Sequence, residues 1–400
     1  MSAARDARGR DGIVAFGGID WWYHNRGHSE CQILTRLARE ETVLWINSIG
    51  MRAPAPGKTE LPVSRYVRKI KSTLKGLRRD PDTGMWIYSP IFVPRYTTGW
   101  LKLNGWLLAF QITLLRLFLG LKNPAAWVTP PTAIEAVERM RWDRIVFNRS
   151  DEFSRFPEAD GAFIAGLERR MLAVADHVLY TSHGLMKREA EQCRAVAYLG
   201  HGVDFATFSA ARPETGPSAL PEALQHLPRP IVGFYGALDD YCVDKTLLIE
   251  TARHVPQGTV LVIGPRAMDT SEIEAEPNVH YLGQIPYEEI PRHAATFDVA
   301  LMPWLQNEWI ESSNPIKLRE YLALGFPIVT MDFPELEPYR ALVYPANSHA
   351  EFLAGLDRAL AEQGVEPVRG RRASVENSTW DAITARVAAI LRDGQESEDG

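Results

Sequence analysis

The sequence has 400 residues, of which 46% are hydrophobic, and a formal net charge of −6. This length suits two domains of about 150 to 200 residues each, and the slightly acidic balance argues against a nucleic-acid partner. The three cysteines, Cys31, Cys193 and Cys242, are scattered without companion histidines at ligand spacing, which excludes a disulfide framework or zinc site as the expected class and favours the reducing cytosol.

Short apolar runs alternate with helical patterns in the first half of the chain. Such alternation predicts an α/β domain with a parallel sheet. The expected strands are residues 13–16, 43–46, 85–88, 126–128, 145–147 and 178–180. The expected helices between them are residues 29–39, 133–141, 162–175 and 185–193.

Two segments of the first half have unusual compositions. Residues 65–79, RYVRKIKSTLKGLRR, contain no acid and predict a basic amphipathic helix of the kind that lies on anionic bilayers. Residues 100–121 are apolar but include two cations, each costing about 2.5–3.5 kcal/mol at the centre of a membrane, so a core or interfacial helix is expected there. The alternative for the basic segment is a solvated helix or a face that steers nucleotides.

The Pro-rich segment 212–230 is the best linker, and a second alternating series follows it. Its expected strands are residues 231–235, 260–263, 279–282, 299–302, 328–330 and 342–344, and a last helix covers about 379–391. We therefore expect two Rossmann-like domains, residues 12–205 and 226–375, facing each other across a cleft, with 376–392 returning to the first. Open α/β sheets bind ligands at the carboxyl ends of their strands.

The most informative segment is residues 312–329, SSNPIKLREYLALGFPIV. Cap residues and Pro315 predict a helix that starts at this proline and ends at Gly325. The start of a helix attracts anions, and Lys317 adds a full charge there. Glu320 lies one turn deeper, where a carboxylate can accept from both ribose hydroxyls. The pattern favours a nucleotide site, and the alternative is a surface helix with an ordinary Lys–Glu pair.

Six pieces of the second half carry a family resemblance. They are residues 201–204 (HGVD), 234–238 (FYGAL), 262–265 (VIGP), 278–283 (NVHYLG), 297–303 (FDVALMP) and the segment with Lys317, Glu320, Tyr321 and Gly325. In this order they resemble the donor-binding domain of GT-B glycosyltransferases, and closely the retaining family 4, or group 1. The first half resembles the same enzymes less specifically, through Gly17-Gly18 and residues 21–28, 148–151 and 180–182. The likeness is to a bacterial branch of cell-envelope or exopolysaccharide assembly.

The sequence departs from the family's pattern at the diphosphate and the sugar. Many members have a Glu eight residues before the equivalent of Glu320, where this chain has Ser312, and Glu311 stands one residue earlier. The Arg that often follows the glycine matching Gly236 is absent, and Lys245 is nearest to the usual Lys. We infer that Lys317 and the helix start take more of the phosphate contact.

The resemblance implies the roles of the donor-site residues. Lys317 would stabilise the leaving diphosphate without a metal or other cofactor, and Glu320 would bind the ribose. Glu311 is a candidate for contacting the donor sugar. The remaining expected donor contacts are Gly236, Gly264, Ile285, Asn314 and Ile316.

In the first domain the candidates surround the expected acceptor. Asp151 follows a predicted strand and could orient or deprotonate a hydroxyl. Retention, which the resemblance favours, needs no strong base, whereas inversion would make Asp151 or Asp20 the base. The expected acceptor or phosphate loop comprises Gly17, Gly18, Asp20, His24, Arg26 and His28. For each histidine, a structural or surface role is the alternative.

The sequence thus predicts a glycosyltransferase that moves a sugar from a nucleoside-diphosphate sugar to a saccharide or a lipid-linked acceptor. It would act in the cytoplasm at the inner face of the membrane, through residues 65–79 and also 100–121. Two alternatives remain open. One is a nucleotide-sugar epimerase of the same architecture, and the other is a fold mate that binds a nucleotide without turnover.

Overall fold

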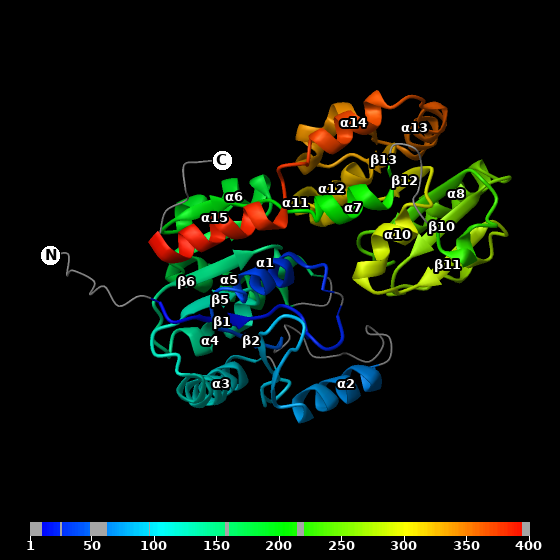
Figure 1. Cartoon of the computed structure of the whole chain (residues 1–400). Helices are drawn as coiled ribbons and strands as arrows, with labels where there is room; N and C mark the ends of the chain where they lie inside the picture. Colours follow the sequence, from blue (N-terminus) through cyan, green and yellow to red (C-terminus); the bar gives the residue numbers. More distant parts are fainter. Residues whose placement is uncertain are drawn as a thin grey trace. The chain divides into compact units, whose positions relative to one another are not determined.

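The computed structural model describes residues 10–24, 26–48, 62–95, 97–156, 160–213 and 220–393, with backbone only for 62–66. The chain divides into two compact units. Unit 1 comprises residues 1–199 and 383–400, and unit 2 comprises residues 200–382 (Figure 1). The chain therefore leaves unit 1 six residues before the predicted domain end at 205.

Unit 1 contains an eight-stranded sheet in the order β3-β4-β2-β1-β5-β6-β7-β8. All neighbours are parallel except β3, which runs antiparallel to β4. The strands are β1 (Ile13–Phe16), β2 (Val43–Ile46), β3 (Leu77–Arg79), β4 (Trp86–Tyr88), β5 (Ala125–Val128), β6 (Ile145–Arg149), β7 (His177–Tyr180) and β8 (Val196–Tyr198). The central strands are buried throughout, as expected for a parallel sheet covered on both faces.

The helices of unit 1 connect these strands. They are α1 (Ser29–Leu37), α2 (Pro62–Leu74), α3 (Thr98–Leu119), α4 (Ile134–Val137), α5 (Gly161–Val174) and α6 (His183–Glu189). Helix α3 packs against α4. The last helix, α15 (Trp380–Asp393), begins in unit 2 and belongs to unit 1 from Ile383. Within unit 1, Arg386 donates to the carbonyl of Tyr198 at 2.6 Å.

Unit 2 contains a six-stranded, fully parallel sheet in the order β11-β10-β9-β12-β13-β14. The strands are β9 (Ile231–Tyr235), β10 (Thr259–Ile263), β11 (Val279–Gly283), β12 (Val299–Met302), β13 (Ile328–Met331) and β14 (Tyr344–Ala346). The helices are α7 (Phe205–Ala211), α8 (Lys245–His254), α9 (Ser271–Glu274), α10 (Ile290–Ala294), α11 (Glu308–Ser312), α12 (Ile316–Leu324), α13 (His349–Ala361) and α14 (Glu366–Ala373).

Every predicted strand matches an observed strand within two residues at each end, whereas β3 and β8 were not predicted and some element bounds differ. The basic segment 65–79 is not one helix, since α2 ends at Leu74 and residues 77–79 form β3 after a turn at Gly76, whose φ is +59°. The last strand starts at Tyr344 rather than 342, because residues 334–342 form a 3-10 helix. Pro315 is the N-cap of α12 and has an extended backbone, rather than being its first helical residue.

Each unit has its own hydrophobic core on its own sheet. Two separate cores explain why the apolar runs of the sequence fall into two series on either side of the linker. Across the described ranges, no helix is both long enough and apolar enough to span a membrane.

Candidate functional site

Three strands of unit 2 end in glycines that pack side by side. The amide of Gly236, after β9, donates to Ile263 at 2.8 Å, and that of Gly264, after β10, donates to Gly283 at 2.9 Å. Gly236 has φ +146° and Gly264 has φ +151°. A Cβ built on Gly264 would lie 1.8 Å from the carbonyl oxygen of Gly236. Only glycine fits both the torsion and the space, so these turns keep the strand ends free of side chains.

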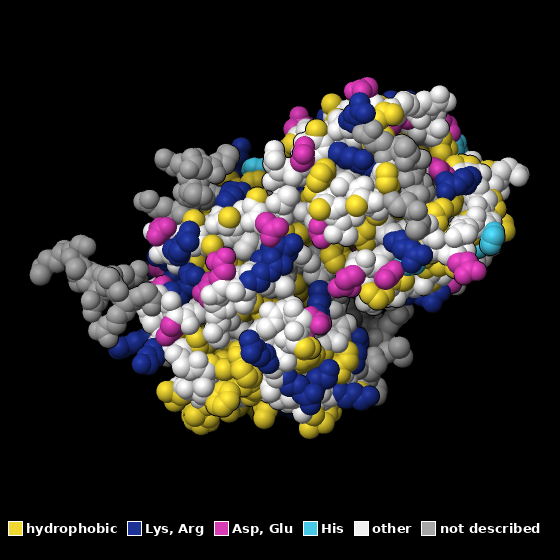
Figure 2. Space-filling model, in the orientation of Figure 1, with side chains coloured by type: hydrophobic (Ala, Val, Ile, Leu, Met, Phe, Trp, Pro, Cys, Tyr) yellow, Lys and Arg dark blue, Asp and Glu magenta, His cyan; other side chains and the backbone are white. Residues whose placement is uncertain are grey.

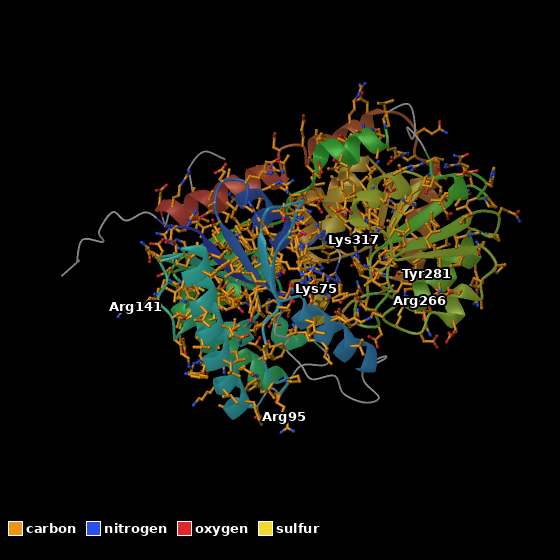
Figure 3. All side chains as sticks on the ribbon, turned by 60° about the horizontal axis from the view of Figure 1, so that its bottom comes forward. Lys75, Arg95, Arg141, Arg266, Tyr281 and Lys317 are labelled. Atoms are coloured by element: carbon orange, nitrogen blue, oxygen red, sulfur yellow. The ribbon has the colours of Figure 1, made fainter. Side chains whose placement is uncertain are left out.

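Lys317 projects from the first turn of α12 toward the turn at Gly236. A Cβ on Gly236 would lie 2.5 Å from Nζ. The ammonium lies over two aromatic rings, 4.5 Å from the Trp304 centroid and 5.0 Å from the Phe234 centroid. Burial lowers the pKa of Lys317, and the nearby Asp239 and Glu320 oppose this. Lys317 is labelled in Figure 3. The site therefore holds a partly desolvated cation beside a backbone turn without side chains, which suits a phosphate group.

Glu320 is buried one turn deeper, with 3% of its surface exposed. Its Oε2 accepts from the Tyr235 hydroxyl at 2.6 Å, and its Oε1 accepts from the Tyr287 hydroxyl at 2.6 Å. Burial raises the pKa of Glu320, whereas both phenols lower it. Each carboxylate oxygen has two lone pairs, so each can still accept a second hydrogen bond.

The other predicted donor residues near the start of α12 have different environments. The Asn314 side-chain oxygen accepts from Arg319 at 2.8 Å within the buried base of the helix. Ile316 begins the helix, and its N-cap, Pro315, has no side-chain acceptor for the first amides. Glu311 stays exposed on α11, and among the described contacts it makes none with Lys317 or Glu320.

Ile285 lies after β11, partly buried against the core of unit 2. Two residues later Tyr287 reaches Glu320. The Arg266 guanidinium, from the segment after β10, lies 4.0 Å from the centre of the Tyr281 ring on β11 (Figure 3). The segment after β11 therefore borders the carboxylate through Tyr287, a residue that sequence reasoning missed.

Sequence reasoning also missed the aromatic surroundings of Lys317 and Glu320. Phe234 and Tyr235 alternate at the end of β9, so they contact Lys317 and Glu320 respectively. Trp304 follows β12 and is 4% exposed, and its indole N–H has no hydrogen-bond partner among the described residues. Their signal was the run of aromatic residues at predicted strand ends.

In unit 1 a buried glutamate side chain lies where neighbouring parallel strands end. Glu30, on α1, accepts from the amide of Gly18 at 3.0 Å and from the hydroxyl of Thr129 at 2.5 Å. Burial raises the pKa of Glu30 to about 7, and the charge of Asp151 acts in the same direction. Strands β1, β5 and β6 are adjacent in the sheet, which brings Gly18, Thr129 and Asp151 together.

Asp151 follows β6, as the sequence predicted for a strand end. Burial raises its pKa to about 6, while a hydrogen bond from the Ser150 hydroxyl at 3.1 Å opposes this. Arg149 fixes the turn, because it donates to the Asp151 carbonyl at 2.6 Å and forms buried ion pairs with Glu168 and Glu189. Asp151 is thus a positioned carboxyl group whose pKa is raised by burial.

The two expected loop glycines have different environments. Gly18 donates its amide to Glu30 rather than leaving it free for a ligand. A Cβ on Gly17 would lie 2.3 Å from the Trp45 ring, so this glycine is required for packing.

The rest of the predicted acceptor loop is tied to other parts of unit 1. Asp20 accepts from Ser72 at 2.7 Å, and His24 Nδ1 lies 3.1 Å from the backbone oxygen of Asp20. Arg26 lies 4.6 Å from the centre of the Trp21 ring and pairs with Asp80 and Asp82 at 3.6 and 3.7 Å.

His28 is exposed and is the N-cap of α1. Asp20 and Arg26 are thus held by other segments of unit 1, whereas His28 stands at the start of α1.

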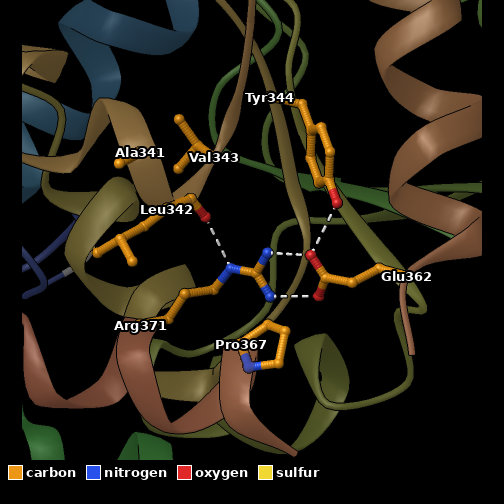
Figure 4. Close-up of a pocket in the computed structure, with 7 residues that line it drawn as sticks. All are labelled: Ala341, Leu342, Val343, Tyr344, Glu362, Pro367 and Arg371. Carbon is orange, nitrogen blue, oxygen red and sulfur yellow. Dashed lines mark hydrogen bonds and ion pairs between the residues drawn. The ribbon is translucent and has the colours of Figure 1, made fainter. Parts of the chain in front are cut away.

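Within the described residues, no cluster of His, Cys, Asp or Glu has the arrangement of a metal site. A cavity of about 320 Å³ in unit 2 lies beside Arg371, which forms an ion pair with Glu362 at 2.5 Å (Figure 4). Tyr344 also donates to Glu362, at 2.8 Å. The polar side chains that line this cavity pair with one another. We therefore interpret the cavity as part of the packing of α14 against the sheet.

The chain is similar to known glycosyltransferases in sequence and in fold. A family model described as Glycosyl transferases group 1 matches residues 229–362. TuaH of Bacillus subtilis (strain 168), named as a glycosyltransferase of teichuronic acid biosynthesis, is 24% identical over 282 residues, which is 65% of this chain and 70% of TuaH.

Solved structures share the fold of the whole chain. Sucrose-phosphate synthase from Thermosynechococcus elongatus superposes with a TM-score of 0.70 at 15% identity, covering 95% of this chain and 98% of that one. HepE from Anabaena, solved with UDP and glucose, gives 0.64 at 13% identity and covers 96% and 99%. The GT-B fold and the group 1 resemblance predicted from the motifs are confirmed. Residues 229–362 of this chain therefore belong to the group 1 glycosyltransferases, and the chain as a whole has the GT-B fold.

Proposed function

We propose that the protein transfers a sugar, with retention of configuration, from a nucleoside-diphosphate sugar to a hydroxyl of a saccharide or lipid-linked acceptor. The reaction serves cell-envelope or exopolysaccharide assembly and takes place in the cytoplasm at the inner face of the membrane. The relationship to TuaH supports the pathway class. HepE was solved with UDP, so uridine is the base to test first.

One observation carries the proposal. In unit 2 a partly desolvated cation, a side-chain-free turn and a buried carboxylate stand together, as Lys317, Gly236 and Glu320. The cation and the start of α12 suit a diphosphate. The carboxylate suits a ribose diol, because it retains lone pairs beyond those used by the two tyrosines.

Negative charge develops on the diphosphate as the sugar leaves. Lys317 is placed to stabilise that charge, and the first amides of α12 add to it. The diphosphate would in turn favour the charged form of Lys317, whose pKa is lowered by burial in the free protein. A diphosphate oxygen near Lys317 also offers an acceptor for the unpaired indole N–H of Trp304. This chemistry needs no metal.

On the acceptor side, we assign Asp151 to orienting the acceptor hydroxyl. Its pKa near 6 allows it to accept a proton at neutral pH. Under retention the departing diphosphate can take the acceptor's proton, so Asp151 needs only to position the hydroxyl.

The first experiment follows nucleotide release from UDP-sugars by the purified chain, with and without saccharide or lipid-linked acceptors. Release that depends on the acceptor, and that persists with EDTA, is the expected result. Conversion of the sugar to an epimer would instead identify an epimerase. Binding without release or epimer would identify a nucleotide-binding fold mate.

Glu320→Gln tests the nucleotide site directly. Gln fits the same space but loses the charge, so we expect UDP affinity to fall about tenfold to a hundredfold in calorimetric titrations. With wild type, 2′-deoxy-UDP should also bind more weakly, whereas the variant should hardly distinguish the two nucleotides. Equal discrimination by both proteins would remove Glu320 from the ribose contact.

A further inference from the structure

Helix α3 of unit 1 exposes a row of large apolar side chains to solvent. Figure 2 shows hydrophobic atoms gathered over this helix. Their exposed fractions run from 42% to 74%. The residues are Leu103, Trp106, Phe110, Leu114, Leu117 and Phe118. Their spacing of three and four residues places them on one side of the helix.

The opposite side of α3 is apolar as well. Leu101, Leu108 and Ile112 are buried in the core of unit 1. A helix that is apolar on both sides normally has both sides covered. The exposed rings of Trp106 and Phe110 already stack on each other, with centroids 6.0 Å apart and planes 8° apart. The outward row is therefore an ordered apolar surface.

The segment before α3 is fixed against this helix and extends the surface. Gln111 exchanges two hydrogen bonds with the backbone of Ile91, both 2.9 Å, and Asn104 exchanges two with Val93, at 2.8 and 2.7 Å. This holds Ile91, which is 65% exposed, and Arg95 next to the helix.

The charged side chains of the segment that carries this surface are all positive. Residues 83–134 contain no acid but include Arg95, Lys102, Arg116 and Lys122. Arg95 projects away from the body of the unit beside α3 (Figure 3). On α2, the exposed apolar side chains of Ile70 and Leu74 stand among exposed cations, and Lys69 ties α2 to this segment by lying 5.1 Å from the Phe92 ring.

We propose that α3 lies in the plane of an anionic lipid bilayer and buries its outward row in the interface. The cations of α2 and of the segment before α3 then contact the headgroups. An apolar row on a segment whose charged residues are all positive complements a lipid surface, because the row can enter the acyl boundary while the cations bind phosphates. This deepens the membrane contact included in the proposed function by assigning the inserted element to α3.

The test is co-sedimentation of the full chain with vesicles of phosphatidylcholine containing phosphatidylglycerol, and with vesicles of phosphatidylcholine alone. We expect binding to the anionic vesicles that weakens with added salt. Trp106→Ser combined with Phe110→Ser should reduce partitioning about tenfold or more. Arg95→Gln should reduce it about fivefold. Val196→Ser combined with Val365→Ser removes two exposed apolar residues elsewhere and should leave it unchanged.

Unchanged sedimentation of the Trp106/Phe110 variant would overturn the proposal. So would a wild-type dimer in light scattering that this variant dissociates, without vesicle binding, because the row would then contact a second copy. UDP titration of the same proteins separates the two hypotheses. Absent UDP binding by wild type would count against the proposed function and leave the vesicle result standing.

Discussion

At the scale of single residues, the environment of Lys317 is the most consequential feature. The sequence showed a lysine in a helical first turn, but not the two aromatic rings that remove water around its ammonium. Because those rings replace solvent, the cation is held ready for an anion at a fixed place.

We therefore expect Lys317→Ala to lower turnover about a hundredfold to a thousandfold. Folding should be retained, because the change removes a partly desolvated charge that burial disfavours. Steady-state nucleotide release and thermal unfolding measure the two effects. Arg253→Ala is the control, since Arg253 is a cation of the same unit that is paired with Glu276 at the surface. Normal turnover of the Lys317 variant would refute the assignment.

Glu30 gives a second prediction at this scale, for pH dependence. Its pKa is raised from 4.5 to about 7 in the folded protein. Between these values the unfolded chain releases a proton that the folded chain keeps, so the free energy of unfolding falls as pH rises. The shift corresponds to about 3 kcal/mol.

Urea unfolding across pH 4.5 to 7 should show this decline in wild type and a weaker decline in Glu30→Gln. Asp151 acts with the same sign, because its pKa is also raised. Glu40→Gln, an exposed position at the end of the same helix region, should keep the wild-type slope. Identical slopes for wild type and Glu30→Gln would contradict the role given to burial.

At the scale of elements, the strand-end turns of unit 2 determine where a ligand can approach the sheet. Gly264 and Gly283 both have positive φ, of +151° and +73°. A Cβ at Gly264 would meet backbone at 1.8 Å, whereas at Gly283 it would enter open space. Substituting these two glycines therefore separates the free-energy cost of a positive φ from the cost of a steric clash.

Gly283→Ala should therefore lower the free energy of unfolding by about 1–2 kcal/mol, the cost of a left-handed backbone. Gly264→Ala adds a steric clash and should lower it by about 3 kcal/mol or more. Urea unfolding followed by tryptophan fluorescence measures both. Equal losses would show that the turn at Gly236 relaxes to accept the extra atom.

The sequence predicted the presence of helices better than it predicted where they end. The run 65–79 has an uninterrupted basic pattern, yet Gly76 turns the chain and residues 77–79 pair with β4. Pairing with β4 satisfies the backbone groups of these residues once the turn at Gly76 has ended the helix. The local sequence pattern of residues 65–79 does not indicate β4 as a partner, because β4 lies several residues further along the chain.

At the scale of the whole molecule, the chain has two separate cores. Every residue of the proposed nucleotide contact lies in unit 2. A ligand stabilises the parts of a protein that it contacts, by mass action on their local opening.

UDP should accordingly protect backbone amides of residues 236–242 and 316–322 from hydrogen exchange. Amides of the unit 1 strands should keep their exchange rates when no acceptor is present. Mass spectrometry of exchanged peptides measures this over the full chain. Protection confined to unit 1 would place the nucleotide elsewhere and contradict the proposed site.

The sequence alone determined the two-sheet α/β organisation, the position of nearly every central strand, and the Lys317–Glu320 pair on one helical face. These features follow from local periodicity, from cap and breaker residues, and from motif order, all of which are written in neighbouring residues. Only the tertiary structure decided that Tyr235 and Tyr287 hold Glu320, that Glu30 takes the amide of Gly18, and that Arg26 pairs with Asp80 and Asp82. Those contacts join residues from different elements, and their partners are chosen by strand order and packing, which no local pattern specifies.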